Sequence, residues 1–197
     1  MRHEITFEQL SQVDREIREK IPPEDNAHWQ SYLFGKGLDA VGLRLEDEIS
    51  DDPGRNPDYH CTPINARVFA YGEGDGIHFC FLIMDDRKIE NCPVVMCCPG
   101  YPGEDGNIVL GEHLYEFLCL GCQSGFITLP NGAEHSLYEM TLAESVGSRD
   151  IEFTRGLAEH RRRVMAYFVG RLNLSPWPNV VSRLDDLKNK YFPMIQL

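Results

Sequence analysis

The chain has 197 residues, of which 42% are hydrophobic and 25% are charged, and its formal net charge is −12 at pH 7. This composition is typical of a soluble globular protein, which excludes a disordered chain and favours a single domain over residues 1–197. The acidic balance argues against nucleic-acid binding, which needs a basic surface. Since the sequence has neither a long apolar segment nor a signal-peptide core, we expect a cytoplasmic protein that does not bind membranes.

Two helices are predicted at the N-terminus. Residues 6–21 carry a capping box, in which Thr6 begins the helix and Gln9 follows three residues later. Apolar residues recur there at helical spacing: Leu10, Val13, Ile17 and Ile21. A second helix is expected over about residues 24–34, before the glycines at 35 and 37.

An acidic loop follows at residues 46–58 and includes Asp51 and Asp52. The carboxylate spacing of an EF-hand is absent, and Pro53 interrupts the run, so the segment does not predict a calcium site. A solvated loop is the simplest interpretation. Its second possible use is a docking surface.

Three strands are predicted over residues 68–71, 77–84 and 93–98, with short polar connections that favour an antiparallel meander. Residues 77–84 contain no charge, and both faces of the alternating pattern are largely apolar. This pattern is typical of a central strand that is covered on both sides.

A helix is predicted to begin near Gly111 and to end at Gly121 in a left-handed conformation. A closing strand over residues 126–129 should follow. We expect one shared core built from the strands and this helix: Phe79, Phe81, Leu82, Val94, Val95, Leu114, Phe117 and Leu118.

The C-terminal part begins with a linker at residues 143–150. A helix is expected over residues 154–172, and another should begin at Ser175-Pro176, because proline is favoured in a first helical turn. The predicted fold class is therefore α+β, with an antiparallel meander around residues 68–98 that is covered by helices from both termini.

The segment FAYGEGDGIHFCFL, the strand PVVM and the helix Gly-Glu-x-Leu-x-Glu-Phe-Leu together resemble the SUKH superfamily. That superfamily contains fungal cell-wall regulators and many bacterial immunity proteins. The similarity covers about residues 59–130. The usual N-terminal Gly-Gly pattern is represented only by Leu-Phe-Gly-Lys-Gly at residues 33–37. The resemblance implies a non-catalytic protein that binds a protein partner, such as a toxin, or a related regulatory scaffold.

Seven cysteines without a secretion signal predict reduced, buried thiols. The pair Cys119 and Cys122 has the spacing of zinc ligands, but no second pair of that kind is present. We therefore expect no metal and no other cofactor. The alternative is a metal- or thiol-dependent enzyme that uses Cys92, Cys97, Cys98, Cys119, Cys122 and His113.

No catalytic residue is predicted. The glycines of residues 72–76 open a strand instead of a helix, so they do not make a phosphate loop. Residues 121–125 are not a nucleophile elbow, and His78 is expected to be a hydrogen-bonded core residue. Partner binding is assigned to acidic residues of two loops, which should form one negative surface for a basic protein: Asp51, Asp52, Glu73 and Asp75.

Overall fold

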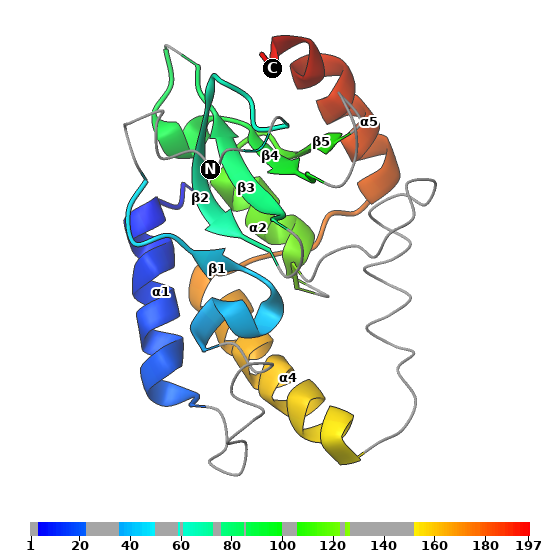
Figure 1. Cartoon of the computed structure of the whole chain (residues 1–197). Helices are drawn as coiled ribbons and strands as arrows, with labels where there is room; N and C mark the ends of the chain where they lie inside the picture. The colour runs from blue at the N-terminus through cyan, green and yellow to red at the C-terminus, as the bar shows by residue number, and fades with distance from the viewer. Residues whose placement is uncertain are drawn as a thin grey trace.

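The centre of the computed structural model is a five-stranded antiparallel sheet with the strand order β1-β2-β3-β4-β5 (Figure 1). The strands are β1 (Arg44–Leu45), β2 (Ala66–Tyr71), β3 (His78–Leu82), β4 (Val94–Cys97) and β5 (Asn107–Gly111). The structure describes residues 4–22, 36–49, 59, 61–72, 76–84, 86–99, 106–122, 125–126 and 152–197. The predicted α+β class and meander are confirmed, with β1 and β5 added at the two edges.

Strand β3 is central, and all five of its residues are buried. It pairs with β2 on one side, where His78 lies opposite Tyr71, and with β4 on the other, where His78 lies opposite Cys97. Successive side chains of a strand point to opposite faces, so β3 contributes to a core on each side of the sheet.

The first core contains the phenylalanine side chains of β2 and β3. The Phe117 ring lies 5.1 Å from that of Phe79 and 5.8 Å from that of Phe69, measured between centroids. Three α-helices also contribute to this core: α1 (Phe7–Lys20), α2 (Leu114–Gly121) and α4 (Glu152–Leu172). The core therefore joins segments from both ends of the chain.

The second core lies on the opposite face and is covered by α5 (Val180–Tyr191), which packs beside β5 (Figure 1). Leu187 and Tyr191 are both fully buried there. Leu82 and Val95 belong to this second core, so the prediction that they share one core with Phe117 is wrong. The reason is strand alternation: Leu82 follows Phe81, and Val95 follows Val94, on the other face.

Helix α1 begins as predicted, with a complete capping box between Thr6 and Gln9. The buried Asp14 on this helix accepts hydrogen bonds from the backbone N–H of Leu38, at 2.7 Å, and from Arg18 Nε, at 2.6 Å. The short 3-10 helix η2 (Gly37–Val41) is thereby fixed between α1 and α4. The predicted helix over residues 24–34 and strand over 127–129 lie outside the described residues.

Two helix boundaries differ from the predictions. Gly121 is not left-handed; instead the Phe126 ring occupies the space that a side chain at Gly121 would need. The left-handed residue is Gly125, with φ of 84°, after which the Phe126 N–H donates to Val41. Helix α5 begins at Val180 behind the cap Asn179, so the proline at 176 precedes the helix.

Helix α5 is tied to β5 through Glu112, which directly follows that strand. Its carboxylate accepts hydrogen bonds from Lys190, from Tyr191 at 2.6 Å and from Arg183 at 3.0 Å. Burial raises the pKa of Glu112, but the hydrogen bonds from Lys190, Tyr191 and Arg183 outweigh it and lower the pKa to about 2. Glu112 is therefore an ionised link between the sheet and the C-terminal helix.

Within the described part of the chain, no helix has both the length and the apolar character that crossing a membrane requires.

We predict that Phe117→Ala destabilises the fold by about 3–5 kcal/mol, because it empties a fully buried aromatic position. The measurement is the free energy of unfolding in urea. Leu120→Ala on the same helix is the control, and because Leu120 is only half-buried it should cost clearly less. Equal effects of the two changes would show that α2 does not pack through Phe117.

We predict that Glu112→Gln lowers stability at pH 7 by about 1–2 kcal/mol, after allowance for solvent screening. The folded-state pKa of about 2 lies below the ordinary 4.5, so the carboxylate stabilises the fold above pH 4.5. That contribution is lost as the pH falls from about 4.5 to 2. Thermal melts across this range should show a flatter pH dependence for the variant. Glu159→Gln, which breaks a surface pair with Arg162, should change stability little.

Candidate partner-binding surface at the β2–β3 end of the sheet

The acidic segment over residues 46–58 starts beside the end of β2. The Glu46 N–H donates to the carbonyl of Phe69 at 2.9 Å, and the Glu46 carboxylate lies near Tyr71. Burial, followed by the neighbouring Glu46 carboxylate, raises the pKa of Tyr71 to about 12, so the phenol stays protonated. The Arg44 guanidinium lies 5.2 Å from the centre of the Tyr71 ring. These contacts fix the first residue of the acidic segment.

The same segment ends at Tyr59, which lies against the beginning of β3. The Tyr59 ring stacks on His78 with 5.7 Å between centroids. Gly76 has φ of 79°, and a Cβ atom built there would lie 2.5 Å from the Tyr59 hydroxyl oxygen. A glycine is required at this position both by the backbone conformation and by the approach of the tyrosine.

The four acidic residues that the sequence assigns to partner binding, Asp51, Asp52, Glu73 and Asp75, lie outside the described residues. The residues on either side of the 73–75 segment lie close to the residues that begin and follow the 46–58 segment. Tyr71 precedes the 73–75 segment and lies near Glu46. Gly76 follows that segment and lies beside the Tyr59 ring. The 46–58 segment therefore starts beside Phe69 of β2 and is followed by Tyr59, which lies beside Gly76. Asp47 and Glu48, which follow Glu46, are both exposed.

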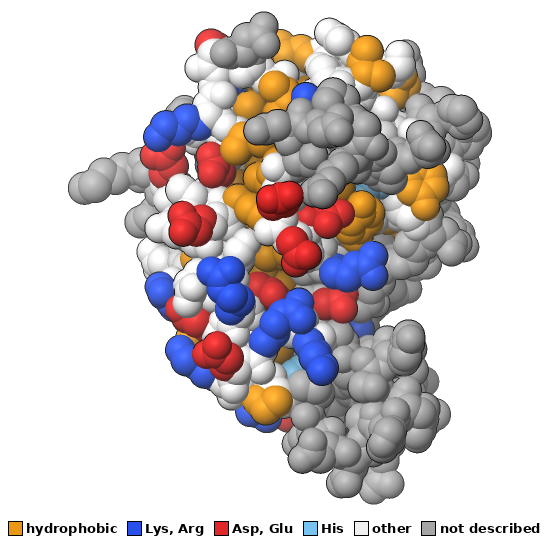
Figure 2. Space-filling view, turned by 60° about the vertical axis from the view of Figure 1, so that its left-hand side comes forward, with side chains coloured by type: hydrophobic (Ala, Val, Ile, Leu, Met, Phe, Trp, Pro, Cys, Tyr) orange, Lys and Arg blue, Asp and Glu red, His pale blue; other side chains and the backbone are white. Residues whose placement is uncertain are grey.

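The charge of the chain is unevenly distributed between its segments. Asp and Glu nearly balance Lys and Arg within the described residues, so most of the net charge of −12 belongs to the remaining segments. Figure 2 shows acidic and basic side chains mixed on one face, with hydrophobic side chains exposed among them. We therefore expect a strongly negative electrostatic potential only where acidic segments lie close together.

His78 is fully buried below this end of the sheet, as the sequence predicts. Its Nδ1 lies 2.7 Å from the carbonyl oxygen of Gly76, and its Nε2 lies 2.9 Å from the hydroxyl of Thr62. Because a carbonyl can only accept, Nδ1 carries a proton. The histidine thus joins the β2–β3 connection to the segment that follows Tyr59.

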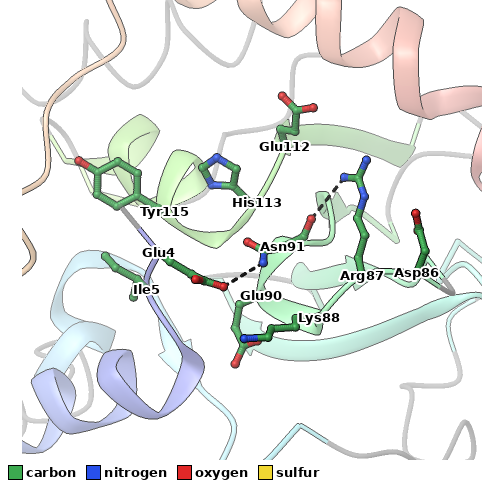
Figure 3. Close-up of a pocket in the computed structure, with 10 residues that line it drawn as sticks. All are labelled: Glu4, Ile5, Asp86, Arg87, Lys88, Glu90, Asn91, Glu112, His113 and Tyr115. Carbon is green, nitrogen blue, oxygen red and sulfur yellow. Dashed lines mark hydrogen bonds between the residues drawn. The ribbon is translucent and has the colours of Figure 1, made fainter. Parts of the chain in front are cut away.

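A second feature is a groove of about 510 Å³ between the start of α1, the β3–β4 connection and the start of α2 (Figure 3). Asn91 Nδ2 donates to Glu4 at 3.0 Å, and Arg87 donates to the backbone carbonyl of Asn91 at 3.3 Å. His113 caps α2 by accepting from the Glu116 N–H at 3.2 Å. The side chains of Asn91, Arg87 and His113 in this groove are therefore engaged in structural hydrogen bonds.

The cysteines of the alternative enzyme hypothesis do not form one cluster. Cys97 belongs to the second core, whereas the first core contains the others: Cys92, Cys98, Cys119 and Cys122. His113 is used as the helix cap. Burial raises the pKa of the thiols of Cys92, Cys98 and Cys122, to about 12 for Cys98 and about 11 for Cys122. Raised pKa values keep thiols protonated, which is the opposite of what a reactive cysteine needs.

The sequence analysis did not identify the roles of Tyr59 and Tyr71 as anchors of the acidic segment. The available signal was their position: one tyrosine ends the acidic segment, and the other precedes the glycine-rich turn. Tyrosine combines a large apolar ring with a polar tip, which suits a residue that must pack and hydrogen-bond at a loop base.

We predict that Gly76→Ala destabilises the protein by about 1–3 kcal/mol, because a Cβ strains the left-handed backbone and displaces Tyr59. Gly170→Ala is the matched control. Gly170 lies on α4 with nothing within 4 Å of a built Cβ, so alanine should stabilise the helix by about 0.5–1 kcal/mol. Urea unfolding of both variants measures the difference. Stabilisation by Gly76→Ala would contradict the proposed contact with Tyr59.

No family model, curated protein sequence or solved structure matches this chain.

Proposed function

We propose that this chain is a non-catalytic protein-binding protein of the SUKH type, which neutralises a basic toxin or serves as a related regulatory scaffold. The acidic β2–β3 end of the sheet is the binding surface. The observation that carries the proposal is the pair of contacts described above, Glu46 with Phe69 of β2 and Tyr59 with Gly76. They support the proposal that the acidic segments at residues 46–58 and 73–75 form one binding surface.

Such a surface suits recognition of a basic protein. Clustered carboxylates attract a positively charged partner over several ångströms and raise the rate of encounter. Tyr59 is 41% exposed at the base of the acidic segment, so its ring can also serve as an aromatic contact. Tyrosine is among the residues that most often contribute large binding energies at interfaces. Charge would therefore guide the partner, and the ring would help to retain it.

The competing enzyme hypothesis finds less support in the chemistry of the described residues. The cysteine thiols are all buried, and His113 in the groove is occupied as a helix cap. Binding needs only shape and charge, which the anchored acidic segments supply. The carboxylates could otherwise serve solubility alone, and the experiment below separates the two roles.

We predict that amide replacement of the four acidic residues, Asp51→Asn, Asp52→Asn, Glu73→Gln and Asp75→Asn, reduces the association rate with the basic partner by about tenfold or more. Stability should remain nearly unchanged. The first partner to test is the product of a toxin gene that neighbours the gene of this chain. Surface plasmon resonance between 50 and 500 mM salt measures the rate, and the unmodified chain should associate much more slowly as salt rises.

A matched control removes the same charge from other surfaces: Glu8→Gln and Glu19→Gln on α1, with Asp185→Asn and Asp186→Asn on α5, all at exposed positions. The control should keep most of the association rate at any salt concentration. Equal rates for the two variants would show that net charge alone matters and would remove the β2–β3 end as the binding surface.

A further inference from the structure

We propose that the second core contains a structural zinc site formed by His78, Cys80 and Cys97, with Cys61 as the fourth ligand. Zinc prefers nitrogen and sulfur ligands in a closed tetrahedral arrangement. The sequence indicates no such site, because two of the ligands lie at alternate positions of one strand and the others are distant. The pairing of the strands creates the cluster.

The three central ligands come from two neighbouring strands. His78 and Cys80 lie on β3, and Cys97 lies opposite His78 on β4. The ligand atoms of the three residues all lie within 4.8 Å of one another, and all three residues are fully buried. Among the residues that the structure describes, this is the one group of three or more His, Cys, Asp or Glu with that geometry.

The distance between the two sulfurs fits a tetrahedral metal. Cys80 Sγ and Cys97 Sγ lie 3.8 Å apart. Zinc–sulfur bonds of about 2.3 Å at a tetrahedral angle place two sulfurs about 3.8 Å apart. The sulfur atoms therefore already have the separation that a shared zinc ion needs, and the distance is far too long for a disulfide.

His78 has the tautomer that a metal ligand requires. Its Nδ1–H donates to the Gly76 carbonyl at 2.7 Å, which leaves Nε2 to supply a lone pair. A hydrogen bond from the second ring nitrogen to a backbone carbonyl is the usual support of a zinc-bound histidine. Nε2 also lies 2.9 Å from the Thr62 hydroxyl, a contact that metal binding would replace.

Two further residues place polar atoms beside the cluster. Cys61 is buried in the same core as Cys80 and Cys97. Asn107 lies opposite Cys97 on β5, is 4% exposed, and donates from Nδ2 to the Cys61 carbonyl at 2.9 Å. Its buried Oδ1 accepts no hydrogen bond from the described residues. A buried polar side chain therefore lies opposite Cys97 in this core.

Zinc at this site would have a structural role. A closed set of four protein ligands leaves no position for a substrate, and the cluster has no exposure to solvent. Binding deprotonates the coordinating thiols, whose protons pass to solvent, so it is favoured at neutral and higher pH. The ion would link β3 and β4 to the segment at residues 61–62, just after Tyr59.

The test begins with the full chain, unfolded under reducing conditions with chelator and refolded with or without one equivalent of Zn²⁺ or Co²⁺. We expect one metal ion per chain by elemental analysis and a Co²⁺–thiolate charge-transfer absorption. The melting temperature should rise by about 10 °C with Zn²⁺. X-ray absorption of the zinc-loaded protein should give three sulfur ligands and one nitrogen ligand, or two sulfurs if Cys61 does not bind. That measurement needs no variant.

Variants then assign the ligands. Cys80→Ser and Cys97→Ser should lose the absorption and the stabilisation by zinc. Cys92→Ser and Cys119→Ser, which change buried thiols of the first core, should keep both. A refolded chain that binds less than about 0.1 metal ion, at a protein concentration far above the Kd expected of a structural zinc site, would overturn the proposal. Metal binding that survives Cys80→Ser or is lost in Cys92→Ser would overturn the assignment equally.

Discussion

The structure depends on the burial of β3 on both faces. A strand in this position must supply apolar side chains to two cores at once, and it does so by simple alternation. Phe79 and Phe81 enter the aromatic core below α1, α2 and α4, while Cys80 and Leu82 enter the core below α5. Strand β3 therefore connects the helices that cover the two faces of the sheet. Substitutions in β3 should therefore disturb the packing on both sides of the sheet.

The proposed binding surface depends on the same strand at its first residue. His78 is buried, yet it contacts the elements that determine where the acidic segments begin and end: the Gly76 carbonyl, the Thr62 hydroxyl and the Tyr59 ring. Carboxylates that are gathered together repel one another, so a loop that collects them needs anchors of another kind. The stacking of Tyr59 on His78 and the backbone hydrogen bond of Glu46 are anchors of that kind.

Much of the fold could be predicted because its signals are local. The capping box at Thr6, the uncharged run of β3 and the apolar stripe of α2 each depend on residues close in sequence. The division into two cores was missed because the hydrophobic pattern shows which face of a strand or helix is apolar. It does not show which other element packs against that face. The role of Gly121 was misassigned for a similar reason, since the ring of Phe126 makes that glycine necessary. The contacts of Tyr59 and the His78–Cys80–Cys97 cluster also depend on register, which spacing along the chain does not encode.

The two proposals meet at residues 59–62 and therefore constrain each other. A zinc ion held by Cys61 would fix the residue two positions after Tyr59, and Tyr59 closes the acidic segment against Gly76. If the ordered segment is what binds the partner, the metal raises partner affinity by removing the entropic cost of ordering it. Thermodynamic linkage then requires the partner to raise metal affinity by the same factor. If the segment is already fixed by Tyr71 and Gly76 alone, the two affinities are independent. A measured dependence of partner affinity on zinc would therefore show that the second core determines the shape of the surface. Independence of the two affinities would show that the tyrosine contacts determine it.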